Sequence, residues 1–305
     1  MLCMNTVIAL VVHLDDTLVF RTSSVALPGD LPTLSWLSDT EIMIQFRNGE
    51  EEEVEENIIL KQTSSIPGEV TPCLFDGVLA SGEEAVISVS GCRDDSETLV
   101  SMSYKTMLID LVLKDGVTKK LDHDYTPNIS EAKEDISLQA PRDPVLDWSS
   151  DQPFTGPMPK GVDVHTKILY DRNLLEHFGN NHNKTKDWLN RVLQLSKPEL
   201  QHSSLNTKIN LIVDAILYKD IRIQADDQSL KSSEFTRVNE NERTLIGAFT
   251  YSGLLGGRVG VAMIGTACRT DGFGTMITEL WREDNSEYHS SRTYVHQLGH
   301  SLGML

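Results

Sequence analysis

The sequence is poor in basic residues and contains no long apolar run. Its 305 residues include 27 Lys and Arg against 45 Asp and Glu, which gives a formal net charge of −18. Nucleic-acid phosphates are bound by clustered Lys and Arg, so this balance argues against a nucleic-acid partner and does not favour an anionic membrane surface. No apolar run approaches the ~18 to 20 residues of a spanning helix. We therefore expect no transmembrane segment.

Cysteine is also scarce. Four cysteines are too few for a disulfide scaffold but enough for one or two bridges: Cys3, Cys73, Cys92 and Cys268. The runs Leu74–Leu79 and Ala85–Val89 flank Ser81-Gly82 and predict a β-hairpin. Cys73 and Cys92 bracket that hairpin, and antiparallel pairing would bring them within the ~5.5 to 6 Å Cα separation that a bridge needs. We predict a Cys73–Cys92 disulfide.

The composition is that of a soluble globular protein, with 39% apolar and 24% charged residues. We predict a β-rich domain over residues 1–125, a linker over 126–160 and a second domain over 161–305. The linker is predicted because prolines accumulate there, and proline fixes φ and removes a hydrogen-bond donor. Strand and helix patterns alternate in the second domain, which predicts an α/β fold.

In the first domain, alternating apolar residues predict strands at Glu41–Phe46 and Met107–Leu113. The acidic run Glu50–Glu56 is interpreted as a solvated turn, because like charges repel and stay in water. The alternative interpretation is that these carboxylates bind a cation.

In the second domain, strands are predicted at Val164–Tyr170 and Arg258–Gly265. The near-continuous apolar run Ile209–Leu217 predicts a strand that is buried on both faces. Helices are predicted at Asn173–Phe178, at Lys184–Leu195, at Asn239–Ala248 and from Ser290 or Ser291 to the last residues.

The last predicted helix carries His296 and His300, four residues apart. At 3.6 residues per turn, both imidazoles lie on one helix face, which is a metal-ligand spacing. Gly303 can end the helix in a left-handed conformation, and the chain can then bend back toward the metal. We predict a metal site held by the two histidines.

Two motifs resemble the reprolysin or adamalysin family of zinc metalloendopeptidases, which includes snake-venom metalloproteinases, ADAM and ADAMTS proteins. The stretch from His296 to Met304, HQLGHSLGM, is close to the family's H-E-L-G-H-x-x-G-M. The stretch Val259–Cys268, VGVAMIGTAC, looks like the family's edge strand upstream of the zinc helix. The resemblance implies a metzincin-like catalytic domain, truncated at its zinc helix. The cysteine-bracketed stretch from Cys73 to Cys92 is similar to part of the family's β-rich propeptide.

The resemblance also implies roles for particular residues. His296 and His300 match two of three zinc ligands, and the third histidine would fall just past Leu305, so we expect the natural protein to continue. Gln297 stands where the family has its catalytic glutamate, and a neutral amide has no basic oxygen to serve as the base. Val259, Gly260, Val261 and Ala262 would pair with an extended protein or peptide substrate. The expected cofactor is Zn²⁺, and the propeptide is expected to act on its own catalytic domain.

The family resemblance also predicts a secreted or extracellular protein. Asn128-Ile-Ser130 and Asn183-Lys-Thr185 fit the acceptor pattern for N-glycosylation, a pattern that also arises by chance. The apolar stretch Val7–Val12 is a marginal signal peptide, because no basic residue precedes it. A short buried strand fits it equally well.

Two alternatives to an active endopeptidase precursor stay open. One is a pseudo-protease that binds protein without cleaving it, suggested by Gln297. The other is that the N-terminal β-rich domain acts by itself as an inhibitor of a partner protease, because a domain of that size could fold independently.

Overall fold

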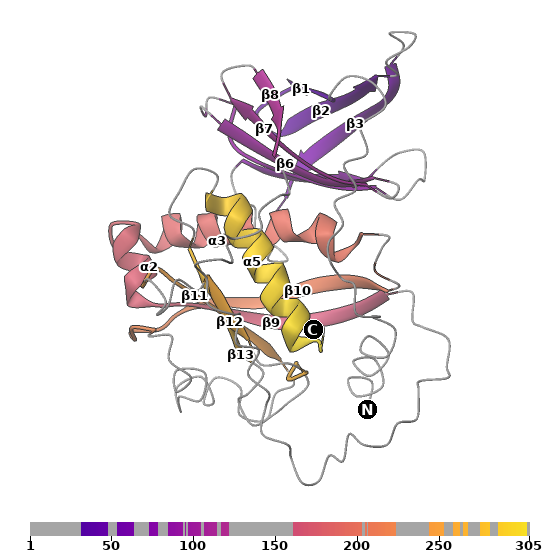
Figure 1. The fold of residues 1–305 in the computed structure, drawn as a ribbon. Coiled ribbons are helices and arrows are strands. Elements are labelled where there is room, and N and C mark those ends of the chain that lie inside the picture. Colours follow the sequence, from indigo (N-terminus) through magenta and orange to yellow (C-terminus); the bar gives the residue numbers. More distant parts are fainter. Residues whose placement is uncertain are drawn as a thin grey trace, which may run out of the picture. The chain divides into compact units, whose positions relative to one another are not determined.

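The structure, a computed structural model, describes residues 32–47, 54–63, 73–78, 85–93, 95, 97–104, 107–114, 117–121, 161–202, 205, 207–223, 244–252, 259–262, 265–267, 275–280 and 286–303. The described residues form two compact units (Figure 1). The first, here called the sheet unit, contains strands β1–β8 and helix α3 from Lys186 onward. The second, called the helix–sheet unit, contains β9–β13, α2, α5 and the first residues of α3. The expected linker over 126–160 lies outside the described residues.

The sheet unit is an antiparallel meander in which each strand pairs with the next one in sequence. Its strands are β1 (Thr33–Trp36), β2 (Glu41–Arg47), β3 (Val54–Gln62), β4 (Leu74–Val78), β5 (Ala85–Ser90), β6 (Glu97–Tyr104), β7 (Met107–Lys114) and β8 (Val117–Lys120). The strands predicted in this region are confirmed. The acidic run differs from its prediction, because its last residues start β3, where Glu56 pairs with Phe46.

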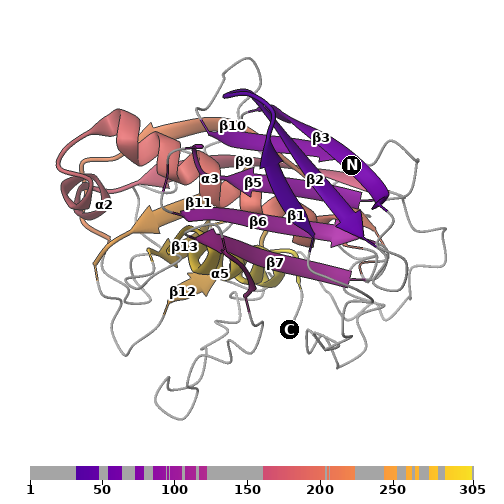
Figure 2. The same ribbon diagram turned by 90° about the horizontal axis from the view of Figure 1, so that it is seen from above.

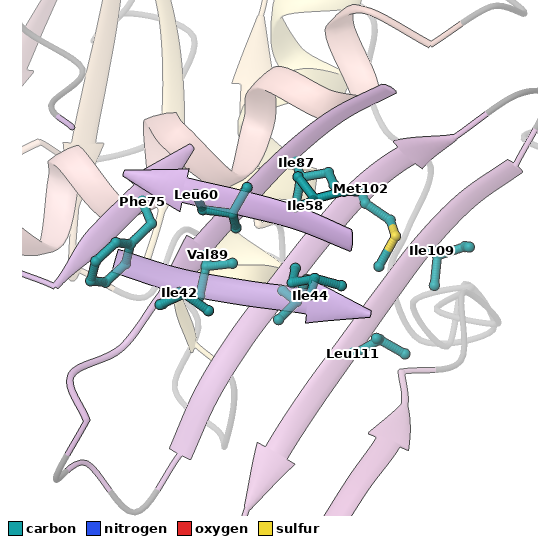
Figure 3. Packing of buried hydrophobic residues seen from close by; sticks show 11 residues of the cluster. Ile42, Ile44, Ile58, Leu60, Phe75, Ile87, Val89, Met102, Ile109 and Leu111 are labelled. Carbon is teal, nitrogen blue, oxygen red and sulfur yellow. The ribbon is translucent and has the colours of Figure 1, made fainter. Parts of the chain in front are cut away.

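The meander curls so that its two ends share one apolar core. Buried side chains from β2 to β7 form a single cluster (Figure 3): Ile42, Ile44, Ile58, Leu60, Phe75, Ile87, Val89, Val100, Met102, Ile109 and Leu111. Leu34 of β1 and Thr118 of β8 line the same small cavity of about 10 Å³. Figure 2 shows β2 crossing over β5 and β6. Successive side chains along a strand point to opposite faces of the sheet, so the residues of this cluster lie on one face, the inner face.

The opposite face of this sheet carries a row of polar residues. Asp76, Ser88, Ser101 and Asp110 are cross-strand neighbours on β4, β5, β6 and β7, and the last three are fully buried. Within the sheet unit, helix α3 (His182–Leu200) meets the Asp76 end of this row. Its Gln194 Nε2 donates to Asp76 Oδ2 at 2.9 Å, and Lys197 Nζ lies 3.6 Å from the same oxygen.

The helix–sheet unit has a mixed sheet of order β10-β9-β11-β13-β12. Strand β11 (Leu245–Thr250) is parallel to β9 (Gly161–Tyr170) on one side and to β13 (Thr275–Glu279) on the other. Strand β12 (Gly260–Ala262) is antiparallel to β13 and forms one edge. With α2 (Arg172–His177) and α5 (Ser286–Ser301), this confirms the mixed α/β class.

The helices predicted at Asn173–Phe178 and Lys184–Leu195 are confirmed as α2 and α3, and the strand at Val164–Tyr170 is confirmed as β9. Three predictions were wrong. Strand β10 (Lys208–Tyr218) is an edge strand with exposed residues along it, so it is not buried on both faces. The end of the predicted helix Asn239–Ala248 is strand β11, in which all six residues are buried. Helix α5 begins at Ser286, and Ser290 and Ser291 are buried inside it.

The described helices include none that is long and apolar enough to cross a membrane.

Candidate functional site

Helix α5 brings the two predicted metal ligands together. The Nε2 atoms of His296 and His300 lie 3.0 Å apart, and the rings meet edge to face at 4.4 Å between centroids. His296 is exposed and His300 is half-buried, so the pair opens to solvent. Two imidazole nitrogens bound to one tetrahedral zinc, at ~2.0–2.1 Å each, lie about 3.3 Å apart. A slight opening of the pair would therefore fit zinc.

The helix ends directly after these histidines. Gly303 has φ of 97°, and its N–H donates to the carbonyl of His300 at 2.8 Å. A side chain at this backbone angle would be strained, which is why glycine suits the position. The prediction that Gly303 ends the helix in a left-handed conformation is confirmed.

The strand that resembles the substrate-binding strand lies beside this helix. Gly260, Val261 and Ala262 form β12, and Val259 precedes it with its carbonyl accepting the N–H of Glu279 at 2.8 Å. The backbone groups on the outer side of β12 face no other strand among the described residues. Figure 1 shows α5 running beside β12 and β13. Among the described residues, the strand at this edge of the sheet lies beside the histidine helix.

The two sequence motifs are joined by hydrogen bonds. The N–H groups of Gly265 and Ala267, which follow β12, donate to the carbonyls of His300 and Ser301, each at 2.9 Å. The last carbonyls of a helix have no partner within the helix, so the loop after β12 satisfies them. This contact couples the position of the edge strand to the end of the histidine helix. The sequence did not predict these hydrogen bonds. The one local signal for a turn here is Gly265, which has a φ of 70°.

Gln297 is buried between the helix and the edge strand, with 1% of its surface exposed. Its Cγ and Nε2 would lie 2.8 Å from a Cβ placed on Gly260, so the amide fills the space that the glycine leaves empty. Its Oε1 has no hydrogen-bond partner among the described residues. Gln297 is therefore held against the strand on which the resemblance places a substrate.

Thr278 of β13 is the cross-strand neighbour of Gly260. The N–H of Glu279 donates to the carbonyl of Val259, so these two residues form a hydrogen-bonded pair. The next pair along the strands, Gly260 and Thr278, is therefore a non-hydrogen-bonded pair. In such pairs the two Cα atoms and the side chains lie closer together than in hydrogen-bonded pairs. The Thr278 hydroxyl is buried and also has no partner among the described residues. Sequence reasoning missed this residue.

Tyr294 fixes the same helix one turn earlier. Its ring stacks on Phe249 at 5.5 Å and packs closely against Gly247, where a Cβ would lie 3.0 Å from the ring. Burial raises the pKa of the Tyr294 hydroxyl well above its usual range, so it stays neutral. Gly247 in β11 leaves space for Tyr294, and Gly260 in β12 leaves space for Gln297. The two side chains are three residues apart on α5.

The described residues contain no cluster of three or more His, Cys, Asp or Glu placed to hold a metal. The pair His296 and His300 stays a prediction of a metal site from the sequence spacing.

The disulfide prediction is confirmed. Cys73 and Cys92 are bonded with a Cα–Cα separation of 4.6 Å, and they close the hairpin of β4 and β5. The N–H of Gly91 donates to the carbonyl of Cys73 at 3.0 Å, which continues the strand pairing up to the bridge.

No protein-family model matches the chain, and no curated protein matches it. Among solved structures, a chain from a structure described as a chaperone–substrate complex is similar at 8% identity and a TM-score of 0.37. The match covers 67% of this chain and 30% of that chain, so this protein spans less than a third of its length. A likeness this distant supports no conclusion about family or function.

Proposed function

We propose that the protein is the precursor of a secreted zinc-dependent endopeptidase of the reprolysin type, with a metzincin-like domain from residue 161 and a propeptide-like domain over residues 1–125. The observation that carries the proposal is the pair His296 and His300, 3.0 Å apart at Nε2, on the helix beside β12, the edge strand of the described sheet. Metal ligation and extended-peptide binding then lie next to each other, as hydrolysis of a peptide bond requires.

In this proposal His296 and His300 would be the residues that hold zinc. Zinc, when bound, lowers the pKa of a coordinated water and polarises the scissile carbonyl. The backbone of β12 pairs with an extended substrate and fixes its register. The hydrogen bonds from Gly265 and Ala267 to the end of α5 hold the strand and the histidines in one arrangement.

Gln297 favours a second candidate, a pseudo-protease that binds peptide without cleaving it. The amide cannot accept the proton that a glutamate base would take, and loss of a general base costs ~10² to 10⁴ in rate. Its amide nitrogen can still donate a hydrogen bond to a bound peptide or water. That nitrogen is buried against Gly260 of the edge strand β12.

The test compares the wild-type protein with His296→Ala, Gln297→Glu and His165→Ala. His165 is a matched control, because it is an exposed histidine on β9 that pairs with Asp214 at 2.9 Å. Zinc content is measured by mass spectrometry after dialysis, and cleavage is followed on a peptide library.

We expect zinc in the wild-type and His165→Ala proteins and its loss in His296→Ala. Gln297→Glu should retain zinc and cleave ~10² to 10⁴ faster than wild type. Equal zinc content in wild type and His296→Ala would overturn the metal site and with it the proposal. Wild-type cleavage as fast as that of Gln297→Glu would rule out the pseudo-protease.

A further inference from the structure

The first turn of α3 is built around Asn181. Its Oδ1 accepts the N–H groups of Asn183 and Lys184, each at 3.1 Å, so its side chain caps the helix. Its carbonyl accepts both the N–H of Thr185 at 3.1 Å and the Thr185 hydroxyl at 3.0 Å. The helix start therefore depends on Asn181 and Thr185 and does not depend on the side chain of Asn183.

Asn183 lies between these two residues and is exposed to solvent, as are His182 and Lys184. No hydrogen bond of its side chain is part of the cap. A large group attached to its side-chain nitrogen would project into solvent and leave every bond of the helix start intact. Asn183, Lys184 and Thr185 also form the Asn-x-Thr acceptor pattern for N-linked oligosaccharide.

We propose that Asn183 is an N-glycosylation site. Its Nδ2 forms a bond to C1 of the first sugar of a lipid-linked oligosaccharide pyrophosphate, and the bond from C1 to the phosphate oxygen breaks. The lipid pyrophosphate leaves with the bonding electrons, and a base of the transferase takes one amide proton. The proposal rests on the secreted location in the proposed function but is independent of zinc and of peptide cleavage.

The structure also sets when the sugar is added. Thr185 is fully buried in the folded helix, and its hydroxyl is already bonded to the Asn181 carbonyl. A transferase that must contact this hydroxyl can reach it only before α3 forms. The oligosaccharide is therefore added before α3 folds, and the folded helix then presents it on an exposed turn.

The test expresses the full chain in animal cells in an Asn128→Gln background, which removes the other acceptor sequence. The purified protein is treated with an amidase that converts glycosylated asparagine to aspartate, and residue 183 is read by peptide mass spectrometry. Asn183→Gln and Thr185→Ala should lose the oligosaccharide and its mobility shift completely. Thr185→Ser keeps the hydroxyl and should retain it. Asn181→Gln changes the cap but not the acceptor pattern and should also retain it.

Unmodified asparagine at 183 in the secreted protein would overturn the proposal, and so would retention of the oligosaccharide in Thr185→Ala. A chain that never enters the secretory pathway would overturn it as well. Zinc content and cleavage, measured on the unglycosylated protein from bacteria, report on the proposed function separately. Folded bacterial protein should remain unmodified when incubated with the transferase and its lipid-linked donor.

Discussion

Gln297 of α5 packs its side-chain amide against the backbone of Gly260 in β12, where a Cβ would lie 2.8 Å from both Cγ and Nε2 of Gln297. This contact, together with the hydrogen bonds from Gly265 and Ala267, joins the helix of the histidine pair to the edge strand β12. It also explains why the strand has a glycine at this position, since any larger residue would push the helix away from the strand.

The first prediction follows from this contact. Gly260→Ala should lower the free energy of unfolding by about 1–3 kcal/mol, because the new Cβ overpacks a buried site. Gln297→Ala should relieve the clash, so the double variant should be more stable than the sum of the single changes predicts, by about 0.5–3 kcal/mol. Urea denaturation of the four proteins measures both effects.

Gly265→Ala is the matched control for this prediction. Gly265 has φ of 70° and no atom within 4 Å of its added Cβ, so its cost of about 1–2 kcal/mol comes from the backbone angle alone. Gln297→Ala should not reduce that cost. Additive behaviour of Gly260→Ala with Gln297→Ala would show that the two residues do not compete for the same space.

The elements that have a clear local pattern could be predicted from the sequence. The i, i+4 spacing of His296 and His300 placed them on one helix face, and the structure brings their Nε2 atoms together. The hairpin of β4 and β5 was predicted because turn residues separate two apolar runs, and with it the Cys73–Cys92 bridge. In each case the information lies within a few residues of sequence.

The contacts that build the site could not be predicted this way. Gly260 and Gln297 are far apart in sequence, and nothing local to either residue encodes their contact. Strand β13 was missed, and β11 was taken for part of a helix, because a strand buried on both faces has no alternation to distinguish it. Strand β10 was placed in the interior because an apolar run does not show whether the strand lies at the edge of its sheet.

The second prediction concerns two neighbouring isoleucines of β3 that face opposite sides of the first sheet. Ile58 is 2% exposed and belongs to the core cluster, whereas Ile59 is 54% exposed. Ile58→Ala should lower the free energy of unfolding by about 2–5 kcal/mol, because it removes buried surface and leaves a cavity. Ile59→Ala should change it by no more than about 0.5 kcal/mol. Equal losses in urea denaturation would contradict the assignment of the inner face.

The third prediction concerns the bridge between Cys73 and Cys92, which closes a loop with a sequence separation of 19 residues. Replacing either cysteine by serine should lower the free energy of unfolding by about 3 kcal/mol, because the unfolded chain regains the entropy that the bridge removes. The double variant should lose no more than either single variant, since each already lacks the bridge. A much larger loss in the double variant would mean that the cysteines stabilise the fold in other ways.

The fourth prediction concerns Asp171, the buried residue that caps α2. Its Oδ1 accepts the N–H of Leu174 at 2.9 Å, and its Oδ2 accepts the N–H of Ile223 at 2.9 Å and the hydroxyl of Thr250 at 2.8 Å. Asp171→Asn presents an amide NH₂ to at least one of these donors and should cost about 1–3 kcal/mol of unfolding free energy. Asp220→Asn, at an exposed carboxylate paired with Arg172, should change stability little. A similar loss in both variants would show that burial is not the cause.

The pH dependence of that loss follows from the ionisation of Asp171. Burial raises the pKa of Asp171, whereas its hydrogen bonds and the charge of Arg222 lower it. The effect of burial is the larger, so the pKa lies above its ordinary value of 3.8. The stability that this raised pKa contributes is fully present below the pKa of the unfolded chain and is lost as the pH rises through the folded-state pKa. In Asp171→Asn the side chain at this position does not ionise, so this pH-dependent contribution to stability is absent. The difference in unfolding free energy between wild type and Asp171→Asn should therefore narrow as the pH rises from acidic toward neutral values. Urea denaturation across this range measures it, and a difference that widens with pH would show that the hydrogen bonds to the carboxylate outweigh its burial.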